Sequence, residues 1–199
     1  MPRNKIKQNL FIISGPSGAG EDSIIDGISK IFPIERVITT TTRDMRPGES
    51  QSQPYYFVKK AEFEKNIKAG NFFEWAQEYN DHLYGVTRKE INRVKNADKI
   101  GIWKIEYKGV ITAKKLMPEI VAIFINAPLK DLANRIRRRD NVTDDYVAQR
   151  ISYTKEWLKH KSIYDYTIDN MEGKLAQAIE KTASIIRKEA GIDKKDQIV

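Results

Sequence analysis

Short apolar runs alternate with helix-forming stretches along this 199-residue chain. Such alternation is typical of an α/β fold, in which helices cover a mainly parallel sheet. The apolar runs predict strands at 9–14, 36–40, 99–105, 119–126 and 165–168, with one more at 51–58 after a turn. The intervening stretches predict helices at 22–31, 60–69, 87–96, 110–116, 129–137, 143–159 and 174–190.

Two stretches interrupt this alternation and are expected to stand out from the central sheet. The first, 39–88, is rich in turn-forming and aromatic residues, and the second, 134–145, carries four arginines. In α/β proteins, excursions at the carboxyl ends of parallel strands are where ligands bind. The pattern therefore predicts that both stretches take part in ligand binding.

A glycine-rich loop joins the first predicted strand to the first predicted helix. It has the glycine spacing of the phosphate-binding motif G-x-x-x-x-G-K-[ST], in the strand–loop–helix context that this motif requires. Its glycines let backbone N–H groups turn inward around a phosphate, and the helix N-terminus adds partial positive charge. The predicted phosphate loop consists of Gly15, Pro16, Ser17, Gly18, Ala19 and Gly20. The alternative interpretation is an ordinary glycine-rich turn.

The residues after this loop depart from the motif. Glu21 stands where the motif has lysine, and Asp22 stands where it has serine or threonine, with Ser23 next; we include all three in the predicted phosphate site. The lysine ordinarily reaches the β- and γ-phosphates, and the hydroxyl binds Mg²⁺. Carboxylates here stabilise the helix by about 0.3–1 kcal/mol each but repel a phosphate. Either these acids cap the helix of an inactive site, or Asp22 is a Mg²⁺ ligand.

Composition excludes several classes of site. The chain has no cysteine, which excludes disulfides, cysteine zinc sites and cysteine nucleophiles and fits a reducing compartment. No apolar run approaches the roughly 18–20 residues of a membrane helix, and the first run is too short for a signal peptide. We therefore expect a cytoplasmic protein with no membrane partner.

The formal net charge of +8 has two interpretations. A solvated surface with a lysine-rich C-terminal helix would account for it, and so would a polyanionic partner. Nucleic-acid binding would need a basic stripe interleaved with aromatic residues or a known module, and the sequence has neither. We therefore expect no nucleic-acid partner.

Several motifs, in order along the chain, resemble those of the guanylate kinase family. The stretch TTTTRDMRPGESQSQPYYFV carries the family pattern T-T-R-x-x-R-x-G-E followed by Y-x-F-V. Later family motifs are matched by FFEWAQ, LYG, KIGIWKIEYKGV, LKDLANRIRRRDNVTDDYVAQRI and YDYTIDN. The resemblance covers about residues 8–190.

This resemblance implies a domain organisation. It implies a three-layer P-loop core with a parallel central sheet, formed by residues 1–38, 89–133 and 151–199. A small GMP-binding subdomain is implied at 39–88, and a lid at 134–150.

The implied activity is transfer of the γ-phosphoryl group of ATP to GMP. Mg²⁺ is the implied cofactor, the two nucleotides are the implied partners, and the protein would be a monomer or a homodimer. The alternative is a catalytically inactive relative that binds GMP or a protein, because Glu21 and Asp22 replace the residues that handle the ATP phosphates.

The resemblance also assigns residues to GMP. The residues implied to bind its phosphate are Arg43, Arg46, Tyr55 and Tyr84. Forked guanidiniums and phenol hydroxyls suit a phosphate dianion. The residue implied to bind guanine is Glu74, whose carboxylate can accept hydrogen bonds from N1–H and N2–H₂ together. Adenine has no such pair of donors, so this residue would distinguish the two bases.

Four further residues complete the implied GMP site: Thr39, Glu49, Thr87 and Glu106. The family usually has a serine or threonine after the tyrosine-glycine, and here that residue is Val86, so we expect Thr87 to substitute for it. Four aromatic residues are expected in the core of the small subdomain instead: Tyr56, Phe57, Phe73 and Trp75.

The implied lid brings three arginines to the transferred phosphate: Arg135, Arg139 and Arg150. Its other two arginines, Arg137 and Arg138, are expected to be solvated.

A lysine stands at an unusual place in the resemblance. The family's strand motif D-I-D is Lys104-Ile105-Glu106 here, so the chain has an acid at 21 where the family has a base, and a base at 104 where the family has an acid. In a P-loop fold this strand lies beside the strand that leads into the loop. We therefore expect Lys104, on a buried strand, to reach the loop and act catalytically in place of the missing lysine. The alternative is that Lys104 only pairs with Glu21 in an inactive protein.

Overall fold

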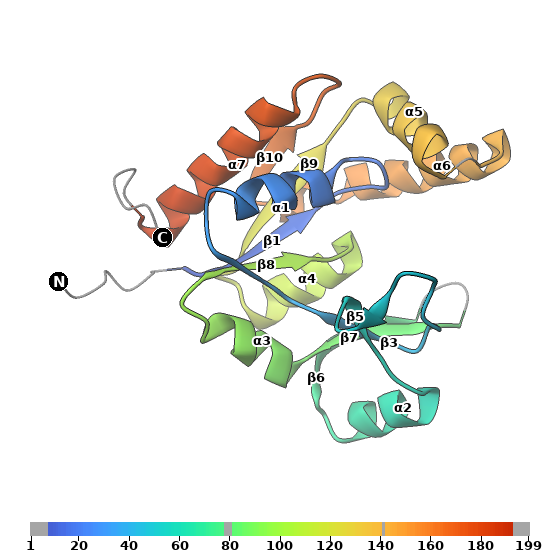
Figure 1. Ribbon diagram of the computed structural model, residues 1–199, viewed down its shortest axis with the longest axis vertical. Coiled ribbons are helices and arrows are strands. Elements are labelled where there is room, and N and C mark those ends of the chain that lie inside the picture. The colour runs from blue at the N-terminus through green and yellow to red at the C-terminus, as the bar shows by residue number, and fades with distance from the viewer. Residues whose placement is uncertain (1–7, 78–80, 141, 193–199) are drawn as a thin grey trace.

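The computed structural model describes residues 8–77, 81–140 and 142–192, with residues 139 and 140 by their backbone alone. Two sheets organise these residues (Figure 1). The first is entirely parallel, in the order β10-β9-β1-β8-β2. Its strands are β1 (Leu10–Ser14), β2 (Ile34–Arg36), β8 (Ile100–Lys104), β9 (Val121–Asn126) and β10 (Tyr166–Asp169).

Helices cover both faces of the first sheet, as Figure 1 shows. On one face, α1 (Glu21–Ser29) and α7 (Leu175–Ala190) bury an isoleucine-rich core against the strands. On the other face lie α3 (Arg88–Lys95), α4 (Tyr107–Leu116) and the end of α6 (Asp144–Lys159). The central strands β1 and β9 are apolar up to their last residues, Ser14 and Asn126, because both faces of the sheet are buried. The predicted three-layer α/β core is confirmed.

The second sheet is mixed and has the order β4-β5-β3-β7-β6. Its strands are β3 (Thr39–Thr41), β4 (Ser50–Gln51), β5 (Pro54–Phe57), β6 (Phe72–Gln77) and β7 (Leu83–Thr87). The helix α2 (Lys60–Lys68) covers one face, where Phe63 packs on Phe72 and Leu83. The other face carries the side chains of Thr39, Tyr55, Glu74 and Tyr84.

Two strand predictions are wrong, the first because the chain changes sheets within it and the second because a turn divides it within one sheet. The expected strand at 36–40 is two strands, β2 and β3, in different sheets, with Val37 and Ile38 between them. The expected strand at 51–58 is divided between β4 and β5, and the hairpin of β6 and β7 was not predicted.

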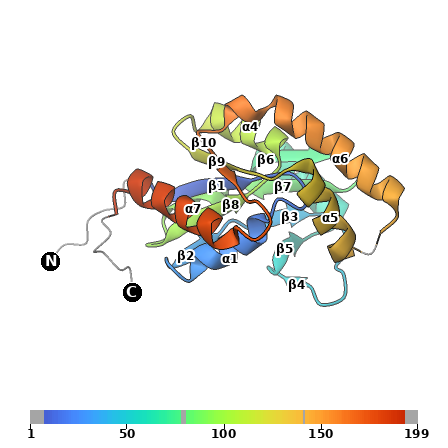
Figure 2. The same cartoon turned by 90° about the horizontal axis from the view of Figure 1, so that it is seen from above.

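The helices α5 (Leu129–Asp140) and α6 form an antiparallel pair beyond the first sheet. In Figures 1 and 2 this pair and the second sheet both lie on the side toward which β1 points. The short helix η1 (Lys161–Ile163) links α6 to β10. Within the described part of the chain, every helix is too short or too polar to span a bilayer.

The pairing of β1 with β8 positions the site. Ile13 is opposite Lys104 in this parallel pair, and β1 ends one residue later at Ser14. The Ser14 hydroxyl donates to the carbonyl oxygen of Ile105 (2.6 Å) and accepts from the hydroxyl of Tyr164 (3.0 Å). The end of β8 is thereby fixed beside the start of the glycine-rich loop.

Candidate active site

The loop after β1 has a backbone that requires glycine. A Cβ atom on Gly15 would lie 2.6 Å from the carbonyl oxygen of Ile125. Gly18 and Gly20 have φ angles of 86° and 93°, in the left-handed region that other residues rarely adopt. Gly20 immediately precedes α1, so the loop leads directly into the positive end of that helix.

The acid at the second position of α1 holds two cations. The Lys104 ammonium donates to Asp22 Oδ2 at 2.6 Å, and Arg36 Nη2 donates to Asp22 Oδ1 at 2.9 Å. Partial burial would raise the pKa of Asp22, but the hydrogen bonds and charges of Lys104 and Arg36 outweigh it and lower that pKa. Lys104 therefore reaches the start of α1 as expected, although it is 43% exposed rather than buried.

Glu21 stays outside this ion pair. The alternative expectation, a salt bridge from Lys104 to Glu21, is wrong because the ammonium hydrogen-bonds to Asp22 instead. Burial raises the pKa of Glu21 to about 7, against the opposing effects of backbone N–H groups and of the Lys104 charge. Arg36 was not predicted, since no motif marks the end of β2.

One face of the second sheet gathers four of the residues assigned to GMP. Thr39 pairs with Tyr55, and Tyr84 pairs with both Thr41 and Ala76. Paired residues point to the same face of a sheet, and so do residues two apart on one strand. The side chains of Thr39, Tyr55 and Tyr84 therefore lie on the same face as that of Glu74. The rings of Tyr55 and Tyr84 meet edge to face with centroids 6.0 Å apart. This face is opposite the one that α2 covers.

Beside this face lies a buried arginine. Arg43 Nη2 donates to both oxygens of Glu49, at 2.8 and 2.9 Å, and its guanidinium carbon is 5.4 Å from the ring centres of Tyr55 and Phe57. Glu49 Oε2 also accepts from the backbone N–H of Arg46 at 2.8 Å, while the Arg46 side chain is exposed. Glu49 therefore orders the turn that carries both arginines.

Glu74 is a partly buried carboxylate without a polar partner among the described residues. Burial raises its pKa to about 7. It approaches the first turn of α4, where a Cβ atom on Gly109 would lie 3.7 Å from Glu74 Oε2. Nearby, Glu106 precedes α4 and accepts from the Tyr153 hydroxyl at 3.1 Å.

The two sheets bring their charged groups close together. Burial raises the pKa of Tyr55, and the positive charge of Lys104 opposes that shift. Tyr55 belongs to the second sheet and Lys104 to the first, so the lysine lies near both the glycine-rich loop and the Arg43–Tyr55 cluster.

Thr87 is not part of this arrangement. It pairs with Phe72, on the sheet face opposite Glu74, and its hydroxyl accepts from the backbone N–H of Glu90 at 3.1 Å as the N-cap of α3. The expectation that Thr87 substitutes for Val86 near guanine is therefore wrong.

The aromatic residues expected in the core of the small subdomain are not in it. That core consists of Phe63, Phe72 and Leu83 with Val58 and Ile67. Phe73 packs instead on Trp103 of the first sheet, and Trp75 is 46% exposed. Tyr56 and Phe57 are partly buried beside polar groups.

The lid arginines have different partners. Arg135 lies over the loop, donating to the carbonyl oxygens of Gly18 (3.2 Å) and Asn170 (2.8 Å). Arg150 donates to the Tyr146 hydroxyl on its own helix, and the side chain of Arg139 lies outside the described residues. The exposed Arg137 and Arg138 form ion pairs with Asp144 and Glu172.

A cavity of about 210 Å³ lies beside the glycine-rich loop. Its walls include Gly20, Arg135 and Asn170, with Met171 and Leu175 on its apolar side. Within the described ranges, histidines and acids form no cluster of three that could hold a metal ion by itself. A divalent cation here would need oxygen ligands from a phosphate in addition to Asp22.

Comparison with known proteins gives a consistent result. A sequence model of the family described as guanylate kinase matches residues 7–189. A guanylate kinase from Buchnera aphidicola subsp. Schizaphis graminum is 38% identical over 165 residues, which are 81% of this chain and 79% of the relative. One from Symbiobacterium thermophilum is 34% identical over 188 residues, 94% of this chain and 88% of the relative.

Solved structures agree. The crystal structure of guanylate kinase from Anaplasma phagocytophilum superposes with a TM-score of 0.69 at 25% identity, covering 94% of this chain and 88% of that one. Shikimate kinase from Acinetobacter baumannii superposes with a TM-score of 0.51 at 11% identity, over 92% and 95% of the two chains, and so shares the fold alone.

The partly buried Glu74 carboxyl should make the free energy of unfolding depend on pH. Its folded-state pKa of about 7 exceeds the ordinary value of 4.5, so its stabilising contribution is complete below pH 4.5 and is lost as the pH rises through 7. In Glu74→Gln the side chain is neutral throughout. The Tm of this variant minus that of the wild type, both measured by calorimetry, should increase as the pH rises from about 5 to about 8. Glu64→Gln, at an exposed position of α2, should keep a constant difference, and a constant difference for Glu74→Gln would contradict the assignment.

Proposed function

This chain belongs to the guanylate kinase family, and we propose that it transfers the γ-phosphoryl group of ATP to GMP with Lys104 in the place of the usual phosphate-loop lysine. The acceptor would lie on the open face of the second sheet. The donor would lie in the glycine-rich loop at the end of β1.

Glu74 is the observation that carries the acceptor assignment. A partly buried carboxylate without a described polar partner is costly unless a ligand supplies donors. Guanine presents N1–H and N2–H₂ side by side and would satisfy both carboxylate oxygens. Adenine presents only one donor on that edge, so it would leave one oxygen unpaired.

The neighbouring cluster suits the GMP phosphate. Tyr55 and Tyr84 offer hydroxyl donors on the same face as Glu74, and Arg43 and Arg46 are adjacent. Arg43 is held in place by Glu49, so a phosphate would meet an ordered guanidinium. The exposed Arg46 is free to move onto the same phosphate, and its side chain has no polar partner among the described residues.

The cavity beside the loop suits the donor base. Met171 and Leu175 offer apolar contact to a purine, and the planar guanidinium of Arg135 can stack on it. Backbone N–H groups of the loop would hold the phosphates attached to that base. Mg²⁺, held by Asp22 and phosphate oxygens, would neutralise charge on the donor.

Lys104 would supply the cation that Glu21 does not. Phosphoryl transfer depends on positioning and positive charge more than on covalent chemistry by the protein. The Lys104 ammonium at the start of α1, and near Tyr55, is where a group moving between the two nucleotides would need that charge. Arg36 adds a second cation at the same carboxylate.

A binding module without activity is the second candidate. Glu21 and Asp22 favour it, since two acids at the loop repel a polyphosphate. A coupled assay of ADP formation separates the two candidates: activity that needs both GMP and Mg²⁺ is expected. GMP binding without any ADP formation would support the binding module and overturn the proposed activity.

Glu74→Gln should reduce the preference for GMP over AMP. The amide nitrogen would face the N1–H and N2–H₂ donors of guanine, whereas the amide matches adenine, which has one donor and one acceptor on that edge. We expect calorimetry to record a loss of preference of about 10–100-fold, the scale of a hydrogen bond to a charged group. The exposed Glu64→Gln serves as the control. Equal binding of GMP and AMP by the wild type would remove Glu74 from the base site.

Lys104→Ala should lower turnover by about 10²–10³-fold, the scale of losing one preorganised charge contact. GMP affinity should change little, because the acceptor residues belong to the second sheet. Lys99→Ala is the matched control, since Lys99 is an exposed lysine that pairs with Glu35 and with no other acid among the described residues.

The exchange of charges gives a second test of Lys104. Glu21→Lys combined with Lys104→Asp restores the family's arrangement, and Asp22→Ser completes the motif. The double or triple variant is expected to turn over faster than the variant with Lys104→Asp alone. Unchanged turnover in Lys104→Ala would refute the catalytic role of this lysine.

A further inference from the structure

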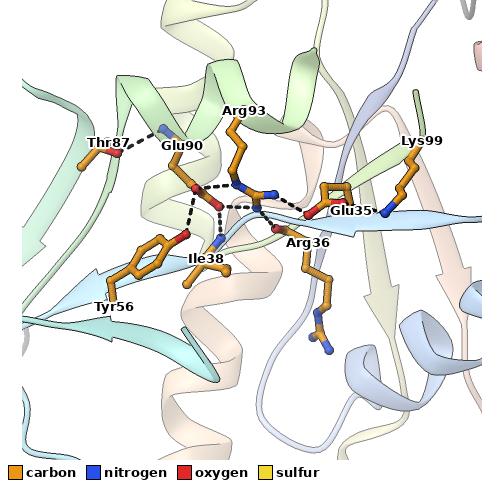
Figure 3. Close-up of polar contacts among 8 residues, drawn as sticks. All are labelled: Glu35, Arg36, Ile38, Tyr56, Thr87, Glu90, Arg93 and Lys99. Atoms are coloured by element: carbon orange, nitrogen blue, oxygen red, sulfur yellow. Dashed lines mark hydrogen bonds and ion pairs between the residues drawn. The ribbon is translucent and has the colours of Figure 1, made fainter. Parts of the chain in front are cut away.

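Within residues 8–77, 81–140 and 142–192, the chain passes between the two sheets twice, and both passages lie against one buried carboxylate. The first passage is Val37 and Ile38, between β2 and β3, and the second is the junction of Thr87 with α3. Glu90, in the first turn of α3, is 4% exposed. Figure 3 shows its carboxylate between these two passages.

Donors from three different elements surround the Glu90 carboxylate. Oε1 accepts from the backbone N–H of Ile38 (2.8 Å) and from Arg93 Nη2 (2.7 Å). Oε2 accepts from Arg93 Nε (2.9 Å) and from the Tyr56 hydroxyl on β5 (3.4 Å). Both oxygens are thereby satisfied, which is what burial of a carboxylate requires. The Ile38 N–H, which extends neither sheet, is satisfied as well.

Arg93 continues this connection to the first sheet. Its guanidinium donates to Glu35 and to the carbonyl oxygen of Arg36 (2.8 Å), both on β2. Lys99 donates to the second oxygen of Glu35 at 3.1 Å, at the exposed edge of the network. The Glu90–Arg93 pair thus joins α3 to β2, to the first passage and to the second sheet, as Figure 3 shows.

We propose that Glu90 and Arg93 are positioning residues that form the pivot between the two sheets. The Glu74 and Tyr55 face moves with the second sheet, whereas the glycine-rich loop and Lys104 move with the first. The angle at the two passages therefore sets how well one half of the site faces the other. The claim that the pivot aligns two nucleotide sites rests on the proposed function. The claim that Glu90 and Arg93 hold the two sheets at a fixed angle does not.

Arg36 connects the pivot to the charged site directly. Its carbonyl oxygen is held by Arg93, and its guanidinium donates to Asp22 at the start of α1. A change in the angle of the first passage would shift this guanidinium relative to Asp22 and Lys104. The pivot therefore acts on both halves of the site.

A distance measurement tests the pivot without reference to activity. The chain has no cysteine, so Glu64→Cys on α2 and Lys181→Cys on α7 provide two unique exposed spin-label sites, one for each sheet. In this background Glu90→Gln places an amide N–H₂ where one carboxylate oxygen accepted, so at least one donor loses its acceptor. Pulsed electron resonance should record a broader or shifted distance distribution for Glu90→Gln than for the parent.

Kinetics provide the second readout. Misalignment of the two halves should lower kcat by about 10–100-fold, as misplacement on the scale of an ångström does. The Kd for GMP alone should change by less than about twofold, because the residues assigned to GMP stay together within the second sheet. A general loss of structure would weaken binding and turnover together, so this split distinguishes positioning from stability.

Two variants keep the test decisive. Lys99→Ala, at the edge of the same network, should leave both the distance distribution and kcat unchanged. If Glu90→Gln does not fold, Tyr56→Phe removes a single hydroxyl from the carboxylate and should broaden the distribution to a smaller extent. An unchanged distribution in the folded variant would overturn the pivot. A broadened distribution in a protein whose wild type forms no ADP would keep the pivot and refute the proposed activity.

Discussion

The parallel pairing of β1 with β8 is the constraint on which the site depends. β1 runs directly into the glycine-rich loop. Because β8 is parallel to β1 and beside it, the residues at the end of β8 lie at the same edge of the sheet as this loop. Ser14 strengthens this pairing by donating to the carbonyl oxygen of Ile105. A side chain at position 104 therefore faces the start of α1, and the sign of its charge decides what that helix end can bind.

The charges around the loop form one set rather than independent substitutions. In the family's arrangement, a lysine at 21, a hydroxyl residue at 22 and an acid at 104 sum to zero. Here Glu21, Asp22 and Lys104 carry formal charges of −1, −1 and +1, which sum to −1, and burial opposes the charge on Glu21. The signs at 21 and 104 are thus exchanged relative to the family, and Arg36, from a strand that no motif marks, adds a cation at Asp22.

Sequence patterns predict most of the first sheet, and they fail where the chain changes sheets. An apolar run at 36–40 does not reveal that Ile38 donates to Glu90 instead of continuing a strand, since a tertiary contact decides this. Thr87 has the right spacing for guanine, but its hydroxyl caps α3 on the other face of the sheet. Glu90 and Arg93 have the i, i+3 spacing of a surface ion pair on a helix, so only the fold reveals that Glu90 is buried.

The exposure of the cations bears on whether the loop is a working site. Lys104 and Arg36 are 43% and 45% exposed, and exposed ion pairs contribute only about 0–1 kcal/mol to stability. Stability is therefore a weak reason for two cations to converge on Asp22. A polyphosphate carries more negative charge than this single carboxylate and offers more acceptor oxygens, so it would compete well for both cations. Asp22 would then be released toward a divalent ion, and the acids after the loop would no longer oppose the donor phosphates.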